Sequence, residues 1–530
     1  MAVGRLAIKR GSTLIERRYN PPLRYAGEEI LFLPGSRVHS ARVSILTRAE
    51  MIGAEQAAFA AGVEPAALME SAGKQMADFV RQNHPRPGRC QVFAGKGHNG
   101  GDVLVAARHL AEAGWGVEIL LPDARLAPLT ETQLRRLDGI RPGEVGVFPL
   151  VVLDGLLGIG AQGNPRGPTA AAILEINSLR INSGAWVLAA DLPSGLDADT
   201  GQPGDPCVQA DATMTMGFAK SGLVSDQAVD FVGRLAVATL DGLGAPDPAS
   251  DDSIAIAPGV LRALLPPRVF DTHKGMAGRV AVVAGSPGFA GAARLCSAAA
   301  VAGGAGLITL FVKKDVWPLL ASSAIPEVMV RQVESYEEVL RDRWDAIAIG
   351  PGLSTRFADE ILSVVQGALS PCVVDADALN VISKSPGILN RCAGPRLLTP
   401  HPGEMERLFP CEGRSRLQWA REFVGLHPVT LLLKGARTII GQAGRPAAYN
   451  TTGNPGMASG GMGDVLTGIA ASLLAQGLDP HEAAMAGAWV CGRAAEIAMA
   501  SGGESQESLR ASHVIRYAGS AFQGLRAGDF

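Results

Sequence analysis

A glycine-rich stretch with a single acid, GNPGMASGGMGDVLTG from Gly453 to Gly468, is the first candidate for chemistry in this sequence. Glycine lets main-chain N–H groups come close to a ligand, and a helix N-terminus directs unpaired N–H groups at whatever lies in front of it. Such a loop before an apolar helical run could hold an anion, with Asp464 beside it as a base. Alone, it could equally be a flexible loop with a capping aspartate.

Three further loops combine glycines with acids, amides and hydroxyls. They are GKGHNGGD (Gly95–Asp102), LDGLLGIGAQGNPRGP (Leu153–Pro168) and DLPSGLDADTG (Asp191–Gly201). Each could be only a cap or turn, because Asp, Ser and Gly are common turn residues. Three such loops follow successive strands, which argues against the explanation that all three are only caps or turns. Carboxylate, amide and hydroxyl oxygens that meet there suit a hard cation as well as a sugar or base.

Strand-length and helix-length apolar runs alternate along the chain and must position these loops. The alternation is typical of parallel βαβ units, in which ligands bind outside the carboxyl ends of the strands. The apolar runs PLVVLD and AWVLAAD end at Asp154 and Asp191, so both acids fall where chemistry is expected. We therefore predict an α/β fold.

A stretch rich in Pro, Asp and Ser, Gly242–Ser253, divides the chain into two halves without a clear internal repeat. We predict two unlike α/β domains joined near residue 248. The predicted boundaries are an N-terminal extension at 1–44, a first domain at 45–245, a linker at 246–254 and a second domain at 255–525. The extension has many arginines but no apolar segment of the secretory type.

Composition excludes several classes of protein. The chain has 530 residues, too many for one core, with 47% hydrophobic and 5% aromatic residues and a net charge of −3. This balance argues against nucleic-acid and membrane-surface binding. Seven cysteines without C-x-x-C spacing indicate a reducing, cytoplasmic location and no structural zinc. The uncharged run Leu295–Val312 fits a buried helix followed by a buried strand better than a membrane span.

The motifs of the first half, together with FAKSGL (Phe218–Leu223), resemble the NAD(P)H-hydrate epimerase domain, a Rossmann-like fold. The resemblance covers about residues 45–245 and implies that Asp191 is catalytic and that Asn99, Asp154 and Ser194 hold a potassium ion. It also implies a set of residues that bind the hydrated cofactor: His98, Asn99, Gly100, Gly101, Asp102, Gly158, Ile159, Gly160, Ala161, Gln162, Gly163, Asn164 and Asp191.

Two positions depart from the family's usual Asn-Asn-Gly-Gly-Asp-Gly. His98 replaces the first asparagine and Val103 the last glycine. His98 could still donate a hydrogen bond. Val103 cannot copy a glycine that needs a positive φ, so we expect a changed loop geometry there.

The second half carries the ordered motifs HKGMAGRVAVVAGSPGFAGAA, GGAGLITLFV, AIGPGL, VVDADALN, LTPHPGE, LLLKGART and GNPGMASGGMGDVLTG. They resemble the ADP-dependent NAD(P)H-hydrate dehydratase, a ribokinase-like α/β fold, over about residues 255–525. The resemblance implies hydrate contacts by Ala305, Gly352, His401 and Asp464. The residues implied for the nucleotide are Lys434, Gly435, Ala436, Arg437, Thr438 and Gly463. Met462 stands where Thr or Ser is frequent, but the neighbouring glycines keep a backbone cradle.

The two domains in this order resemble the bifunctional nicotinamide nucleotide repair enzymes. The resemblance implies epimerisation of the R and S hydrates of NADH and NADPH, ADP-dependent dehydration of the S form, potassium in the first domain, magnesium in the second and a homo-oligomer. Phosphorylation from ADP makes a ring hydroxyl a good leaving group. A glycine-lined helix start can neutralise the transferring phosphate, and Asp464 can accept the hydroxyl proton as the catalytic base.

Other interpretations stay open. Small-molecule kinases share the ribokinase-like fold and its G-x-G-D element, so the second half could be a kinase and the first half a binding module without activity. His401 could be a turn residue. Asp375 and Asp377 could hold magnesium or cap turns, and we expect Cys296 and Cys491 in the core.

Overall fold

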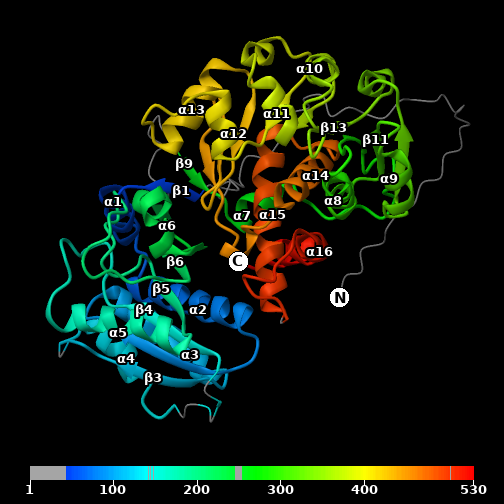
Figure 1. Ribbon diagram of the computed structural model, residues 1–530. Coiled ribbons are helices and arrows are strands. Elements are labelled where there is room, and N and C mark those ends of the chain that lie inside the picture. Colours follow the sequence, from blue (N-terminus) through cyan, green and yellow to red (C-terminus); the bar gives the residue numbers. More distant parts are fainter. Residues whose placement is uncertain are drawn as a thin grey trace, which may run out of the picture. The chain divides into compact units, whose positions relative to one another are not determined.

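The computed structural model describes residues 43–123, 125–140, 143, 145–146, 148–244, 253–501 and 503–530 (Figure 1). Ala41–Phe530 forms one compact unit. Most of the predicted extension, 1–44, and of the predicted linker, 246–254, lies outside the described residues.

Six parallel strands form the sheet of the first half, in the order β3-β2-β4-β5-β6-β8. Their bounds are β2 (Arg89–Ala94), β3 (Gly116–Leu120), β4 (Leu150–Gly155), β5 (Trp186–Ala190), β6 (Ala212–Met216) and β8 (Arg234–Ala238). The chain adds β3 on one side of β2 and β4 on the other. The switch point of this open parallel sheet, where ligands are expected, therefore lies between β2 and β4.

Helices cover both faces of this sheet. One face packs against α2 (Pro65–Asn83) and α3 (His98–Glu112), and the other against α5 (Gly167–Ser183). Two further helices are α1 (Arg48–Ala60) and α4 (Pro128–Arg135). The result is a three-layer arrangement, and the α/β fold predicted from the alternation of apolar runs is confirmed.

A twelve-stranded sheet spans the second half in the order β12-β11-β10-β13-β14-β15-β16-β17-β18-β9-β1-β7. Its parallel part is β10 (Arg279–Val283), β11 (Leu307–Val312), β12 (Val328–Gln332), β13 (Ala346–Ile349), β14 (Cys372–Val374), β15 (Arg396–Leu398) and β16 (Thr430–Leu433). The chain switches direction between β10 and β13, which is the second place to look for a site.

The other edge of this sheet mixes the two halves of the sequence. It contains β17 (Ile439–Gln442), β18 (Ala447–Tyr449), β9 (Ser253–Ala255), β1 (Val43–Leu46) and β7 (Ala219–Lys220). β1 pairs antiparallel with β9 and parallel with β7. The sheet thus runs without a break from the second half into strands of the first.

Two layers of helices enclose the large sheet. One layer contains α7 (Pro258–Leu264), α8 (Ala290–Ala302), α14 (Met462–Ala475), α15 (Pro480–Ala500) and α16 (Ala511–Ala527). The other layer contains α10 (Ala358–Gly367), α11 (Ala376–Ile382), α12 (Pro402–Leu408) and α13 (Arg416–Leu426), and its core includes Leu223 and Val232 of the first half. Remaining helices are the short α6 (Val229–Val232) and α9 (Trp317–Ser323).

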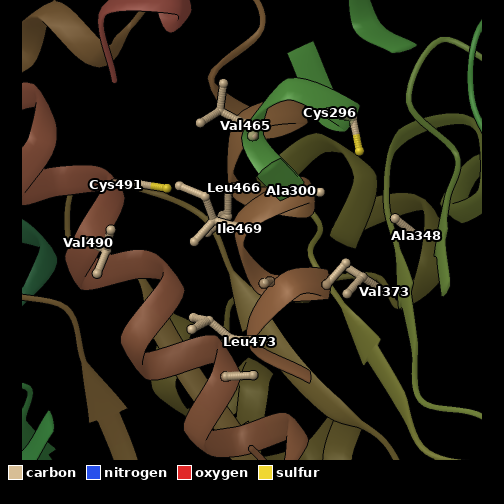
Figure 2. Packing of buried hydrophobic residues seen from close by; sticks show 14 of the residues in the cluster. Cys296, Ala300, Ala348, Val373, Val465, Leu466, Ile469, Leu473, Val490 and Cys491 are labelled. Atoms are coloured by element: carbon tan, nitrogen blue, oxygen red, sulfur yellow. The ribbon is translucent and has the colours of Figure 1, made fainter. Parts of the chain in front are cut away.

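Figure 2 shows how α14 is packed in the hydrophobic core of the second half. Val465, Leu466, Ile469 and Leu473 of α14 are packed among side chains from α8, α15 and the sheet. Cys296 and Cys491 belong to this packing and are buried, as predicted. The uncharged run Leu295–Val312 is the end of α8 followed by β11, which confirms the expectation of a helix and a strand. Among the described helices none has both the length and the apolar character that a membrane crossing requires.

Candidate functional site

The first site forms where the ends of β2, β4 and β5 meet. Asn99, in the first turn of α3, donates from Nδ2 to the carbonyl of Leu157 at 3.0 Å and to that of Ala190 at 2.9 Å. One amide therefore joins the loops that follow all three strands. Gly97 precedes α3 without a side-chain cap, so the first N–H groups of the helix stay open for a ligand.

Asp154 and Ser194 form a buried pair beside Asn99. Ser194 donates from Oγ to Asp154 Oδ1 at 2.6 Å and from its backbone N to Oδ2 at 2.8 Å, and Oγ accepts from Leu157 N at 2.9 Å. Burial raises the pKa of the Asp154 carboxyl to about 6, although the hydrogen bonds from Ser194 and Leu156 oppose this. The three side chains predicted for potassium are thus brought together around Leu157.

The oxygen atoms at this place suit a hard monovalent cation. A Cβ added at Gly158 would lie 2.6 Å from Asn99 Oδ1, so glycine leaves room beside that oxygen. Carboxylate, hydroxyl, amide and backbone oxygens are the ligands that hard cations take. The described residues hold no group of three or more His, Cys, Asp or Glu that could bind a metal.

Asp191, directly after β5, is paired with a fully buried lysine. Its φ is 67°, a backbone conformation that side chains rarely adopt. Lys220 Nζ, Met216 N at 3.1 Å and Thr215 Oγ1 at 3.3 Å all bond to Asp191 Oδ1. Among the described residues, Oδ2 has no such bond, and Asp191 as a whole is 5% exposed. Strain of this kind often marks functional positions.

Sequence reasoning missed Lys220 as a site residue. The lysine is 0% exposed and also donates to Thr215 Oγ1 at 3.0 Å and Met216 O at 3.2 Å. The feature of the sequence that could have identified it is its place in the motif FAKSGL.

Two more carboxyls complete the acidic side of the first site. Burial and then the charges of Asp191 and Glu55 raise the pKa of Asp102 well above its ordinary value. Burial and then Asp191 also raise the pKa of Glu55, on α1. Sequence reasoning did not select Glu55, because nothing in a helical run of alanines and glutamates marks it.

The remaining first-site residues lie as follows. His98 is exposed at the start of α3, and Gly158–Asn164 forms a largely exposed loop after β4. The expectation of a changed loop at Val103 is wrong: the residue lies inside α3, is 0% exposed and has no positive φ. A Cβ at Gly155 would lie 2.4 Å from Val103 Cγ2, so the valine fills space that this glycine leaves.

The second site is built on the N-terminus of α14. Gly461 precedes the helix with φ 90° and without a side-chain cap, which leaves the N–H groups of the first turn open. Asp464 lies in that turn. Burial and then the charge of Asp375 raise the pKa of Asp464 to about 7, and Lys434 opposes the shift. A general base works best with a pKa near the working pH.

Lys434 and Asp375 face this helix start as an ion pair. Lys434 Nζ lies 2.8 Å from Asp375 Oδ1 and 3.7 Å from Glu404 Oε2. Thr467, one turn into α14, donates to Asp375 Oδ2 at 2.9 Å. A Cβ at Gly463 would lie 3.3 Å from Lys434 Nζ, so glycine keeps the cation close to the helix start, where a phosphate would sit.

Two predicted hydrate contacts lie after β13 and β15, the strands on either side of β14. Gly352, with φ 57°, follows β13, and its carbonyl accepts from Ser286 Oγ of the loop after β10 at 2.9 Å. His401 follows β15 and caps α12: its Nδ1 accepts from Gly403 N at 3.0 Å and Glu404 N at 3.3 Å. A ring that accepts at Nδ1 carries its hydrogen on Nε2, which can donate to a ligand. The turn interpretation of His401 and its binding role are therefore compatible.

Ala305 is not brought together with these residues. It precedes β11, so it lies at the amino edge of a parallel sheet whose carboxyl ends carry the site. Gly303, two residues before it, packs on Ser472 of α14, and Ser472 is eight residues beyond Asp464, or about 12 Å along the helix. The sequence match gave no information on which end of the strand the residue occupies.

The segment Lys434–Thr438 follows β16 and lines a cavity of about 1330 Å³. Gly463 and Met462 at the start of α14 line the same cavity. Arg437 is 4% exposed and donates from Nη2 to the carbonyl of Gly233. Thr438 Oγ1 donates to Gly435 O at 3.0 Å, closing the turn. The loop and the helix start thus share one space, large enough for a nucleotide.

Asp375 and Asp377 have structural partners. Asp375 holds Lys434 and Thr467, and although burial opposes it, Lys434 keeps the pKa of Asp375 below its usual range. Asp377 Oδ2 accepts from Ser354 N at 2.8 Å. Mg²⁺ is commonly held by one or two carboxylates together with substrate phosphates, and Asp375 beside Gly463 is the carboxylate that fits that pattern.

Comparison with known proteins finds a matching family for each half of the chain. Residues 65–222 match the family described as YjeF-related protein N-terminus, and residues 280–516 match the family described as NAD(P)H-hydrate dehydratase. An ADP/ATP-dependent NAD(P)H-hydrate dehydratase from Bacillus subtilis, crystallised with ATP and Mg²⁺, is 28% identical over 51% of this chain and 97% of its own, with a TM-score of 0.45.

Two full-length relatives cover most of the chain. The bifunctional NAD(P)H-hydrate repair enzyme Nnr of Moorella thermoacetica is 37% identical over 86% of this chain and 92% of its own length. That of Escherichia coli is 35% identical over 84% of this chain and 87% of its own length. The chain belongs to the family of bifunctional NAD(P)H-hydrate repair enzymes.

Proposed function

We propose that the chain repairs hydrated NADH and NADPH with two separate sites, one of which interconverts the R and S hydrates and the other of which dehydrates the S form with ADP. The proposal rests on the observation that the two halves contain acids in two different environments. Asp191 is tied to a buried lysine in the first half, whereas Asp464 stands at an open helix N-terminus with a pKa near 7 in the second.

For dehydration, the β-phosphate of ADP is placed between the first turn of α14 and Lys434. The ring hydroxyl of the hydrate attacks that phosphorus, AMP leaves, and Asp464 takes the hydroxyl proton. The phosphorylated oxygen then leaves as inorganic phosphate while the adjacent ring carbon loses a proton, which restores NADH or NADPH. Helix N–H groups and the ammonium stabilise the charge that develops on the phosphate.

For epimerisation, the hydroxyl must leave the ring as water and water must return on the other face. Asp102, whose pKa is strongly raised, is suited to protonate the departing hydroxyl. Asp191 Oδ2 is suited to accept a proton from the incoming water, with Lys220 holding Oδ1. One water leaves and one enters, so the net change is a proton moved from Asp102 to Asp191. Pairs of carboxyls in unlike environments commonly divide acid and base roles in this way.

The two cations have different places in this proposal. Asn99, Asp154 and Ser194 would hold potassium, which supplies a positive charge at the end of β4 and keeps the loop after it in place. Asp375 would hold magnesium at the second site, where the ion would further neutralise phosphate charge.

Product analysis tests the proposal. The protein is given R-hydrate of NADH, first alone and then with ADP, and nucleotides and cofactor are separated by chromatography. We expect S-hydrate without ADP, and NADH, AMP and inorganic phosphate in equal amounts with it. A stable phosphorylated product without NADH would instead support the small-molecule kinase, and no S-hydrate in the first reaction would make the first half a binding module only.

A further inference from the structure

The loop proposed for the nucleotide is attached to the first half of the chain through a buried arginine. Arg437, 4% exposed, donates from Nη2 to the carbonyl of Gly233, which stands between α6 and β8. Burial, and then the charge of Arg234, lower the pKa of Arg437 to about 10. Burial of a charged side chain is costly unless it is hydrogen-bonded, so the bond to Gly233 offsets part of the cost of burying Arg437 and joins the two elements.

A second arginine holds the same loop from its other side. Arg416, at the start of α13, donates from Nη1 to Arg437 O at 2.9 Å and from Nη2 to Leu433 O at 3.2 Å and Lys434 O at 3.1 Å. Its Nη1 also lies 3.1 Å from Asp226 Oδ1 of the first half. The loop carbonyls and a first-half carboxylate therefore share one guanidinium.

A third arginine reaches the glycine stretch before α14. Arg234, the first residue of β8, donates from Nε to Glu496 Oε1 at 3.1 Å, and both side chains are at most 9% exposed. The same oxygen accepts from Gly453 N at 2.8 Å, and Arg493 donates to Glu496 Oε2 at 3.0 Å. Gly453 is the first residue of the glycine-rich stretch that contains Asp464. Both walls of the nucleotide site thus depend on contacts from the first half.

The cavity beyond the loop is also shared. Its lining includes Lys434–Thr438 and Gly463 from the second half and His84, Trp186 and Arg234 from the first. Two buried donors at its wall, Arg437 Nε and Asn454 Nδ2, have no hydrogen-bond partner within the described part of the chain. Unpaired buried donors call for an acceptor such as an ordered water, so this wall has polar groups that the chain itself does not satisfy.

We propose that the first domain is a structural part of the nucleotide site of the second: Gly233 and Arg234 position the two loops that bind ADP, and the adenosine end of the nucleotide lies in the shared cavity. This rests on the nucleotide role of Lys434–Thr438 proposed above. It means that contacts from the first domain change the affinity for ADP. Because coupling is reciprocal, bound ADP in turn stabilises those contacts.

The first test uses Arg234→Met. We expect the KM for ADP to rise about tenfold, because a hydrogen bond between charged groups is lost, while kcat at saturating ADP changes less than threefold. Arg234→Lys should recover part of the loss, since an ammonium can still pair with Glu496. The matched control is Arg89→Met, which removes an arginine at the start of β2 whose partner Glu118 lies 3.6 Å away in the same half. R-to-S exchange reports that each variant is folded.

The second test needs no variant. Hydrogen exchange of the whole protein is measured with and without ADP. We expect ADP to slow amide exchange both in Lys434–Thr438 and in the first-half segment 226–238, and Arg437→Met to remove the second effect. Protection of the loop without protection of 226–238, or an unchanged KM in Arg234→Met, overturns the inference. If ADP protects neither segment, it is the proposed role of the nucleotide loop that fails.

Discussion

Each half of the molecule contains a lysine paired with a buried aspartate at a strand end, yet the two pairs differ in what they leave free. Lys220 bonds to Asp191 itself, the acid that the first site offers to its substrate. Lys434 bonds to Asp375 and leaves Asp464, the acid of the second site, without that partner. The difference appears in the pKa of Asp464, which burial and Asp375 raise to about 7.

The comparison shows that a lysine–aspartate pair does not identify a base. In the first site the lysine bonds to one oxygen of the acid that we propose as the base. In the second site the pair faces the helix start at which we propose that the phosphate binds, and its aspartate raises the pKa of the neighbouring acid by repulsion. Under the proposed function, the same two residue types therefore position a catalytic group in one half and tune the pKa of one in the other.

The largest effect is expected from a substitution of Asp464, the acid that has no lysine bonded to it. Asp464→Asn keeps shape and hydrogen bonding but cannot take a proton, so dehydration of the S-hydrate should fall by about 10²–10⁴-fold. ADP affinity should change far less, because helix N–H groups and Lys434 carry it, and R-to-S exchange should stay at the parent rate. Three assays on the one variant measure this.

Two results would contradict that role. A collapse of ADP affinity would mean that Asp464 positions nucleotide or metal. Turnover within a few-fold of the parent would place the base elsewhere, and Asp375, already paired with Lys434, would have to be reconsidered.

The next largest effect is expected when Asp191 loses its lysine partner. Lys220→Met leaves Asp191 buried without its cation, so epimerisation should fall by about 10²-fold, the lower range for a positioned acid–base group. The free energy of unfolding should drop by about 3–5 kcal/mol, as expected when one partner of a buried ion pair is removed. Denaturant unfolding and R-to-S exchange are the measurements.

A double variant separates stability from chemistry. Lys220→Met with Asp191→Asn removes both charges, so stability should recover while epimerisation stays low. Recovery of epimerisation in the double variant would show that the pair is only structural.

Sequence reasoning predicted the fold class and much of the first site, because both depend on local signals. Loops at strand ends placed Asp154 and Asp191 correctly at the sheet edge, and parallel topology brought Asn99, Asp154 and Ser194 together. It failed where the answer depends on packing across the chain. Val103 was expected to disturb a loop, but α3 begins earlier, at His98, and includes it. The cytoplasmic location and the homo-oligomer stay predictions.

The second site shows the same limit. Asp375 and Lys434 are 59 residues apart in sequence, so no spacing could reveal their pairing or its effect on Asp464. Lys220 and Glu55 were missed because a lysine in a strand and a glutamate in a helix are ordinary residues until burial is known. Ala305 was assigned by motif alone, and the direction of β11 places it at the other edge of the sheet.

The pH dependence of dehydration gives a smaller effect. A base whose pKa is about 7 is protonated below that pH, so kcat/KM should rise with pH, tenfold per unit below about 7, and level off above it. Lys434 lowers the pKa of Asp464, so Lys434→Met at saturating ADP should move this limb to higher pH. A limb near pH 4 in the parent, or no movement in the variant, would mean that Asp464 is not the titrating base.

The last comparison concerns the two departures at the start of α3, and it has the smallest effect on rates. Val103 is 0% exposed and fills the space beside Gly155. Val103→Gly removes a buried side chain and puts glycine inside a helix, so the free energy of unfolding should fall by about 2–4 kcal/mol.

His98 is exposed, and His98→Asn keeps a hydrogen-bond donor at the helix start, so R-to-S exchange should stay within about threefold of the parent. Thermal unfolding and exchange rates of the two single variants measure this. A stable Val103→Gly would mean that the helix start adapts to glycine without loss, and a large drop in His98→Asn would show that the imidazole itself contacts the hydrate.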